Sequence, residues 1–135
     1  MEIWRLVAPL LSPAIDVTGG RTDMGEVFRR LRAGQHILWV ARDDDGPVVA
    51  AFTTRVAQYP LKRMLVVDAC GGSEMGEWLA VVVDTFRRFA RDSGLDGVEM
   101  YGRAGWARAL RRYGWRSPLV LCEIDVADAQ QENNL

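Results

Sequence analysis

Residues Val66 to Ala80 read VVDACGGSEMGEWLA and contain the junction that decides the fold. The run Met64–Ala69 is apolar apart from Asp68, as expected of a strand buried on both faces. After a bend of small residues, apolar side chains recur at helical spacing until Gly94. These are Met75, Trp78, Leu79, Val82, Phe86, Phe89 and Ala90. The pattern predicts a buried strand, a glycine-rich bend and a long amphipathic helix with Ser73 as its N-cap.

Two further strands are expected before this junction. The segments Gln35–Arg42 and Pro47–Ala57 are rich in β-branched and aromatic residues. Asp43–Gly46 between them has the composition of a hairpin turn. These strands and the run from Met64 should therefore form an antiparallel meander.

The N-terminal segment is expected to contain one short strand and one helix. Glu2–Val7 predicts the strand, and Pro9 and Pro13 interrupt the chain after it. A helix should begin after Asp23, whose side chain can cap it, and end at Gly34.

The chain after the long helix predicts a strand, a short helix and a last strand. These are expected at Leu95–Tyr101, Gly105–Tyr113 and Leu119–Val126. The expected fold class is α/β, an α+β mixed sheet in which an antiparallel meander joins a β-α-β crossover with helices on both faces. Residues 1–126 should form one domain, followed by a polar, flexible tail at 127–135.

Composition excludes several classes of protein. The 135 residues are 49% hydrophobic and 26% charged, as in a soluble globular domain. The 17 basic and 18 acidic side chains give a net charge of −1, which offers no general attraction to nucleic acid or to an anionic membrane. Apolar runs are too short for a membrane span, and Glu2 follows Met1 where a signal peptide would be basic.

Neither a metal site nor a disulfide framework is expected. Cys70 and Cys122 have no second cysteine or histidine close in sequence and are interpreted as buried free thiols in strands. His36, at the start of an apolar run, is interpreted as structural.

The order of elements resembles the GNAT superfamily of acyl-CoA-dependent N-acyltransferases over almost the whole chain. The segment GWARALRRYGW (105–115) is similar to the closing helix of that family, with its aromatic residue after a glycine. The resemblance implies a GNAT-like fold and, if the chain is an enzyme, acetyl-CoA as its cofactor.

In the GNAT family the bend before the long helix binds the coenzyme pyrophosphate through backbone N–H groups. The resemblance implies cofactor-binding candidates Gly71, Gly72, Ser73 and Gly76. Gly76 occupies the last small position of the family motif, but Glu74 stands at its middle glycine and Gly71 where Gln or Arg belongs. The carboxylate of Glu74 should repel a pyrophosphate, whereas the Gly71-Gly72 pair can form an anion nest.

Acyl transfer also requires a base for the attacking amine and an acid for the leaving thiolate. The candidate catalytic carboxylates are Asp68, near the exit of the third meander strand, and Glu99, on the crossover strand, and each could equally be a solvated residue at a strand end. The family often has a tyrosine four residues before the last glycine, and here that position is Leu110. The scaffold of the family is therefore better kept than its catalytic residues.

Arginines and tryptophans gather around the last helix. The candidate interaction surface consists of Arg103, Trp106, Arg108, Arg111, Arg112 and Trp115. Such a set suits planar contacts at a protein interface. The alternative is an ordinary solvated helix whose arginine stems cover the tryptophans.

The combination Gly71-Gly72-x-x-Met75-x-x-Trp78, followed by Gly102-Arg103-x-Gly105-Trp106, is similar to small GNAT-like proteins of tailed bacteriophages and prophages. This resemblance implies a location in the host cytoplasm or in the phage virion. It also implies partners among other phage proteins or a second copy of the chain, bound through the last helix.

Three functions remain open from the sequence. The first is a non-catalytic structural or interaction component of a virion. The second is an active, acetyl-CoA-dependent N-acetyltransferase. The third is a phage-encoded protein that binds and inhibits a host protein.

Overall fold

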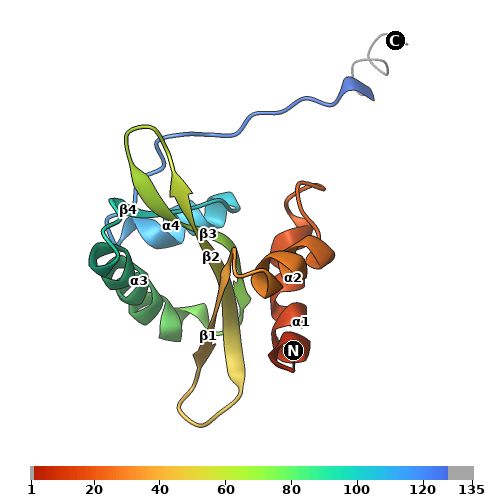
Figure 1. The fold of residues 1–135 in the computed structure, drawn as a ribbon, viewed down its shortest axis with the longest axis vertical. Coiled ribbons are helices and arrows are strands. Elements are labelled where there is room, and N and C mark those ends of the chain that lie inside the picture. Colours follow the sequence, from red (N-terminus) through yellow and green to blue (C-terminus); the bar gives the residue numbers. More distant parts are fainter. Residues whose placement is uncertain (1, 128–135) are drawn as a thin grey trace.

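A computed structural model describes residues 2–127 of the chain. Four helices and four strands follow one another in this part (Figure 1). Their bounds are α1 (Ile3–Asp16), α2 (Met24–Arg32), β1 (Ile37–Arg42), β2 (Val48–Gln58), β3 (Arg63–Gly72), α3 (Met75–Asp92), β4 (Gly97–Met100) and α4 (Ala104–Arg111).

The strands form one mixed sheet in the order β1-β2-β3-β4. β1, β2 and β3 pair antiparallel, and β4 pairs parallel to β3 after the crossover through α3. The predicted mixed α/β fold, with its meander and crossover, is confirmed. The register between β2 and β3 shifts at Thr53/Thr54, because Thr53 faces Ala69 and Thr54 faces Val67. Asp68 is therefore the extra residue of a β-bulge.

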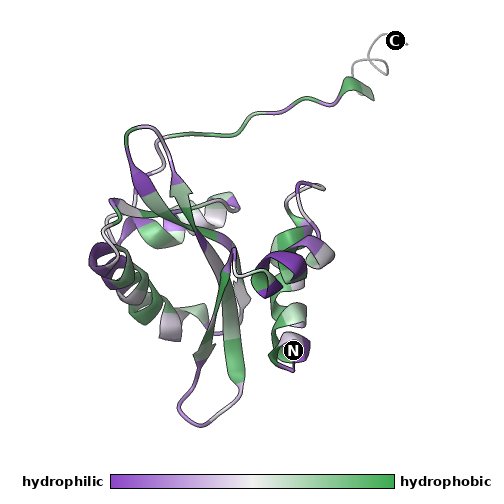
Figure 2. Ribbon diagram, viewed as in Figure 1, coloured by the Kyte–Doolittle hydropathy of each residue, from purple (hydrophilic) through white to green (hydrophobic). Residues whose placement is uncertain are grey.

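Each face of the sheet carries its own pair of helices (Figure 1). α1 and α2 pack on one face, where small residues such as Ala51 and Ala69 receive them. α3 and α4 cover the other face over a larger core that includes Phe52, Leu65 and Leu110. In Figure 2 the hydrophobic colour lies along parts of the strands and of the helices that pack on them.

The predicted strand at Glu2–Val7 is wrong, because these residues belong to the start of α1. Val7, Leu11 and Ile15 recur every four residues and are buried against the sheet. Pro9 and Pro13, also four apart, lie on the exposed side of the helix. The carbonyls that they leave without an N–H partner are on the side where water can bind them.

The prediction of a last strand at Leu119–Val126 is also wrong in the structure of the single chain. These residues have no strand pairing and are exposed. Cys122 is therefore exposed and not buried as expected, whereas Cys70 is half-buried in β3. Most of the tail predicted at 127–135 lies outside the described residues.

Within residues 2–127, no helix combines the length and the apolar character that crossing a membrane requires.

Candidate functional site

The bend between β3 and α3 is held by the sheet rather than left open. The backbone N–H of Ser73 donates to the carbonyl of Val49 at 2.9 Å, and the Ser73 carbonyl accepts a hydrogen bond from the indole of Trp78. The prediction that Ser73 is the N-cap of this helix is wrong, because Glu74 occupies the N-cap position. Glu74 has a left-handed backbone, with φ of 58°, and its side chain makes no capping hydrogen bond.

The glycines of the bend differ in what surrounds them. A Cβ at Gly71 would overlap the carbonyl oxygen of Leu10 in α1, and one at Gly72 would overlap the carbonyl oxygen of Val49. Both glycines therefore allow close backbone packing. Gly76, in the first turn of α3, has open space around the position of a Cβ.

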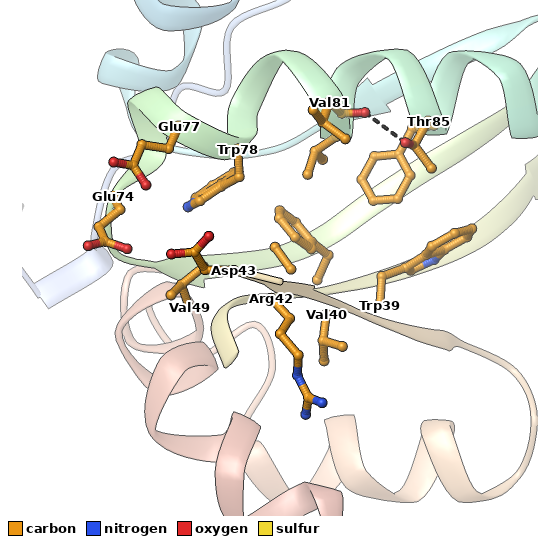
Figure 3. A pocket seen from close by; sticks show the side chains of 14 residues that line it. Trp39, Val40, Arg42, Asp43, Val49, Glu74, Glu77, Trp78, Val81 and Thr85 are labelled. Atoms are coloured by element: carbon orange, nitrogen blue, oxygen red, sulfur yellow. Dashed lines mark hydrogen bonds between the residues drawn. The ribbon is translucent and has the colours of Figure 1, made fainter. Parts of the chain in front are cut away.

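A cavity of about 270 Å³ opens between α3 and the strands β1 and β2. Its walls are mainly apolar and include Phe52 and Trp78. Figure 3 shows the carboxylates of Asp43, Glu74 and Glu77 at one end of this cavity, beside the first turn of α3. None of the three forms an ion pair within residues 2–127. We call these three residues the acidic mouth. Their carboxylates place negative charge around the N-terminus of α3.

The space where β3 extends beyond β4 is filled by side chains. The pairing of these strands ends at Val67 and Met100, whereas β3 continues to Gly72. Trp106 and Trp115 pack into this region from α4 and the residues after it. The cavity that remains there measures about 20 Å³, which is close to the space of a single water molecule.

Asp68 projects to the α1/α2 face because it follows Val67, which packs on the α3/α4 core, and the bulge leaves Ala69 on the same face as Asp68. Its Oδ2 accepts a hydrogen bond from Nε of Arg55 at 2.7 Å and lies 3.5 Å from Nε2 of His36. His36 is buried, and neither of its ring nitrogens has a hydrogen-bond partner within the described chain. Burial lowers the pKa of His36, although the Asp68 carboxylate opposes this shift. The sequence predicts a structural role for His36 and does not indicate its nearness to Asp68.

Glu99 faces the same side of the sheet as Asp68. Its neighbours Val98 and Met100 pack on the α3/α4 core, so alternation along β4 turns Glu99 to the opposite face. Tyr101, burial and Glu99 together raise the pKa of Tyr59 to about 12. Asp68 and Glu99 thus share the α1/α2 face of the sheet. Tyr59, which the sequence does not indicate, is a neighbour of Glu99.

The structure separates the arginines and tryptophans of the last helix. Trp106 and Trp115 are half-buried against the α3/α4 core. The arginines on the surface are Arg103, Arg108, Arg111 and Arg112. Within residues 2–127 these guanidinium groups form no ion pair, and Arg112 lies 5.7 Å from the ring centre of Tyr113. The exposed face is therefore basic rather than mixed basic and aromatic.

No protein-family model and no curated protein matches the sequence. Solved structures do match. One is a probable acetyltransferase with a TM-score of 0.66 and 15% identity, covering 93% of this chain and 92% of that protein. The chain has a GNAT-like fold.

Two other similar structures support this assignment. A Trypanosoma brucei acetyltransferase has a TM-score of 0.58 and 12% identity, covering 77% of this chain and 78% of its own. A predicted acetyltransferase from Clostridium acetobutylicum, with acetyl-CoA in its structure, has a TM-score of 0.58 and 12% identity over 76% of this chain and 72% of its own. At such identities the likeness establishes the fold and leaves activity to the residues of the site.

Proposed function

We propose that this chain is a non-catalytic GNAT-fold protein that acts through protein–protein contacts. The observation that carries the proposal is the acidic mouth at the first turn of α3. A pyrophosphate bound there would face the carboxylates of Asp43, Glu74 and Glu77. Their repulsion opposes the attraction of the helix N-terminus for an anion.

The filled space beside β3 supports the same proposal. A ligand group larger than a water molecule could enter this space only by displacing Trp106 or Trp115 from the core, because the remaining cavity is about 20 Å³. The Arg55 side chain also engages Oδ2 of Asp68 in an ion pair, so this carboxylate already has a structural partner in the chain.

The basic face of α4 is the surface that we assign to the partner. Its exposed arginines have no ion-pair partner within the described chain, so an acidic protein surface would complement them. We propose that this partner is another virion protein of a tailed phage, or a second copy of this chain. A host protein inhibited by the chain would fit the same chemistry and is the third candidate.

An active N-acetyltransferase is the second candidate function. The observation that favours it is the placement of Asp68 and Glu99 on one face of the sheet, with Tyr59 close to Glu99. Acetyl-CoA accompanies one of the similar structures, and the bend Gly71–Gly76 would be its pyrophosphate site here.

Coenzyme binding separates the two proposals. We expect CoA and acetyl-CoA, titrated into the purified chain, to leave its melting temperature unchanged. A ligand at a hundredfold excess over its Kd would instead add ~2.7 kcal/mol of stability. Stabilisation of the wild type, with turnover of acetyl-CoA, would overturn the non-catalytic proposal.

A variant that loses two mouth carboxylates is the matched control. Glu74→Gly with Glu77→Gln opens the bend and reduces the negative charge. Binding of CoA by this variant alone would support a pyrophosphate site that the carboxylates block.

The phage assignment needs a separate measurement. Mass spectrometry of purified particles should find the chain if it is a virion component. Its absence from particles, with capture of a host protein through Arg108 and Arg111, would favour the inhibitory role instead.

A further inference from the structure

The segment after α4 carries large apolar side chains into solvent. Residues 119–126 read LVLCEIDV. The apolar members Leu119, Val120, Leu121, Ile124 and Val126 are between 73% and 89% exposed. Figures 1 and 2 show this segment as a mainly apolar, extended stretch that leaves the body of the domain. Apolar residues in such a row mark a contact surface.

The order of these residues is that of a strand with one buried face. Every second residue is apolar on one side, namely Val120, Cys122, Ile124 and Val126. The other side changes from leucine to the acidic residues Glu123 and Asp125. This alternation specifies which face of the segment is buried when it pairs as a strand.

The chain itself holds the segment by an exposed ion pair. Nη2 of Arg21, in the loop between α1 and α2, lies 2.6 Å from Oε2 of Glu123. Both side chains are at least half exposed, and pairs of this kind stabilise little. The pair also places Glu123 near the α1–α2 loop and not along β4.

β4 offers the complementary surface. It is the last strand of the sheet, so one of its edges has unpaired N–H and C=O groups. Val98 and Met100 are only half-buried although they pack on the α3/α4 core. Trp115, from which the segment departs, packs on the same core. A strand added at this edge would cover these side chains.

We propose that Leu119–Val126 forms the fifth strand of the sheet of a second copy, along the outer edge of β4, and that the exchange is reciprocal. Val120, Cys122, Ile124 and Val126 then face the α3/α4 core of the partner copy. Reciprocal exchange satisfies both segments and both β4 edges, so assembly closes at a two-fold dimer. A foreign partner would fill the edge or the segment but not both. This proposal does not depend on whether the chain binds a coenzyme.

Light scattering coupled to size exclusion tests the stoichiometry. The wild type should have twice the mass of the chain. Ile124→Lys places a charge on the apolar face and should raise the dimer Kd more than about 100-fold. Asp125→Lys, at the adjacent position on the other face, should leave the dimer intact. Both positions are exposed in the single chain, so both variants should keep the helical circular dichroism of the domain. A monomeric wild type, or equal effects of the two variants, would overturn the proposal.

Paramagnetic relaxation tests where the segment binds. In one preparation, a nitroxide is attached to the cysteine of an Asp125→Cys variant that also carries Cys122→Ser. This chain is mixed with ¹⁵N-labelled wild type that carries no nitroxide. Amide signals of Val98–Met100 in the ¹⁵N-labelled copy should broaden. Broadening confined to the β1 edge of the ¹⁵N-labelled copy would show a different site. No broadening in that copy would show that the segment does not pair with the β4 of a second copy. Either result contradicts strand exchange.

Discussion

Nε2 of His36 lies 3.5 Å from Oδ2 of Asp68, the same oxygen that accepts the hydrogen bond from Arg55 at 2.7 Å. A separation of 3.5 Å is too long for a well-formed hydrogen bond. The side chain of His36 is only 6% exposed, so its imidazole is held almost out of water without a partner in the described chain. This arrangement explains why burial outweighs the nearby carboxylate and lowers the pKa of His36.

The charges around His36 can be tested by its NMR titration, because it is the single histidine of the chain. We expect a pKa below the usual 6.5. Asp68→Asn should lower the pKa further, since the carboxylate favours the imidazolium, and Arg55→Gln should raise it, since the guanidinium disfavours it. A rise in the Asp68→Asn variant would contradict the geometry.

The pH dependence of stability should follow from the same residue. The unfolded chain binds a proton at His36 near pH 6.5, whereas the folded chain binds it only at lower pH. The free energy of unfolding should therefore fall as the pH drops below 6.5, down to the pKa of the folded state. Urea denaturation at several pH values should show this slope in the wild type and a smaller slope in His36→Gln.

Glu26→Gln is the control for this slope. Arg29 and Arg30 lower the pKa of Glu26 from 4.5 to about 2. The contribution of Glu26 is therefore present above pH 4.5 and is lost as the pH falls toward 2. Because the Glu26 carboxylate also favours the charged form of His36, the variant should lower the pKa of His36 further and keep the direction of the slope near pH 6.5. Loss of this slope in the variant would show that His36 is not its source.

Gly71→Ala and Gly76→Ala should have opposite effects on stability. At Gly71 the new methyl group meets the carbonyl of Leu10, so α1 must move and the free energy of unfolding should fall by about 3 kcal/mol. At Gly76 the methyl group enters open space in a helix, where alanine stabilises by about 0.5–1 kcal/mol. Thermal melts of both variants measure this difference. Equal destabilisation would show that α1 does not lie against Gly71.

The sequence predicts the centre of this fold well because its periodicities are undisturbed there. β2, β3 and α3 each have a continuous apolar pattern that is typical of a single type of structure. The prediction for the segment of α1 is wrong because Pro9 and Pro13 suggest breaks in the chain. The helical spacing of Val7, Leu11 and Ile15 is the signal that indicates the helix. The segment Leu119–Val126 has the pattern of a strand, but a local pattern does not specify which edge, or which copy, it pairs with.

The candidate site was less predictable for a related reason. Asp68 could be proposed from its place in a strand, but its nearness to Arg55 and His36 depends on which segments the tertiary fold brings beside β3. The acidic mouth likewise joins Asp43, from the β1–β2 turn, to Glu74 and Glu77 of α3. Only Glu74 was singled out from the sequence, because the family motif places a glycine there.

The left-handed backbone of Glu74 supplies a last prediction. A residue with a Cβ in this conformation is strained by about 1–2 kcal/mol relative to glycine. Glu74→Gly and Glu74→Ala both remove the carboxylate from the start of α3, so both lose the same favourable interaction with the helix dipole. Only glycine relieves the backbone strain at position 74. The free energy of unfolding of Glu74→Gly should therefore exceed that of Glu74→Ala by about 1 kcal/mol. Urea denaturation of the pair measures this difference. Equal stabilities would mean that residue 74 does not adopt the left-handed conformation in solution, and that the acidic mouth is arranged differently.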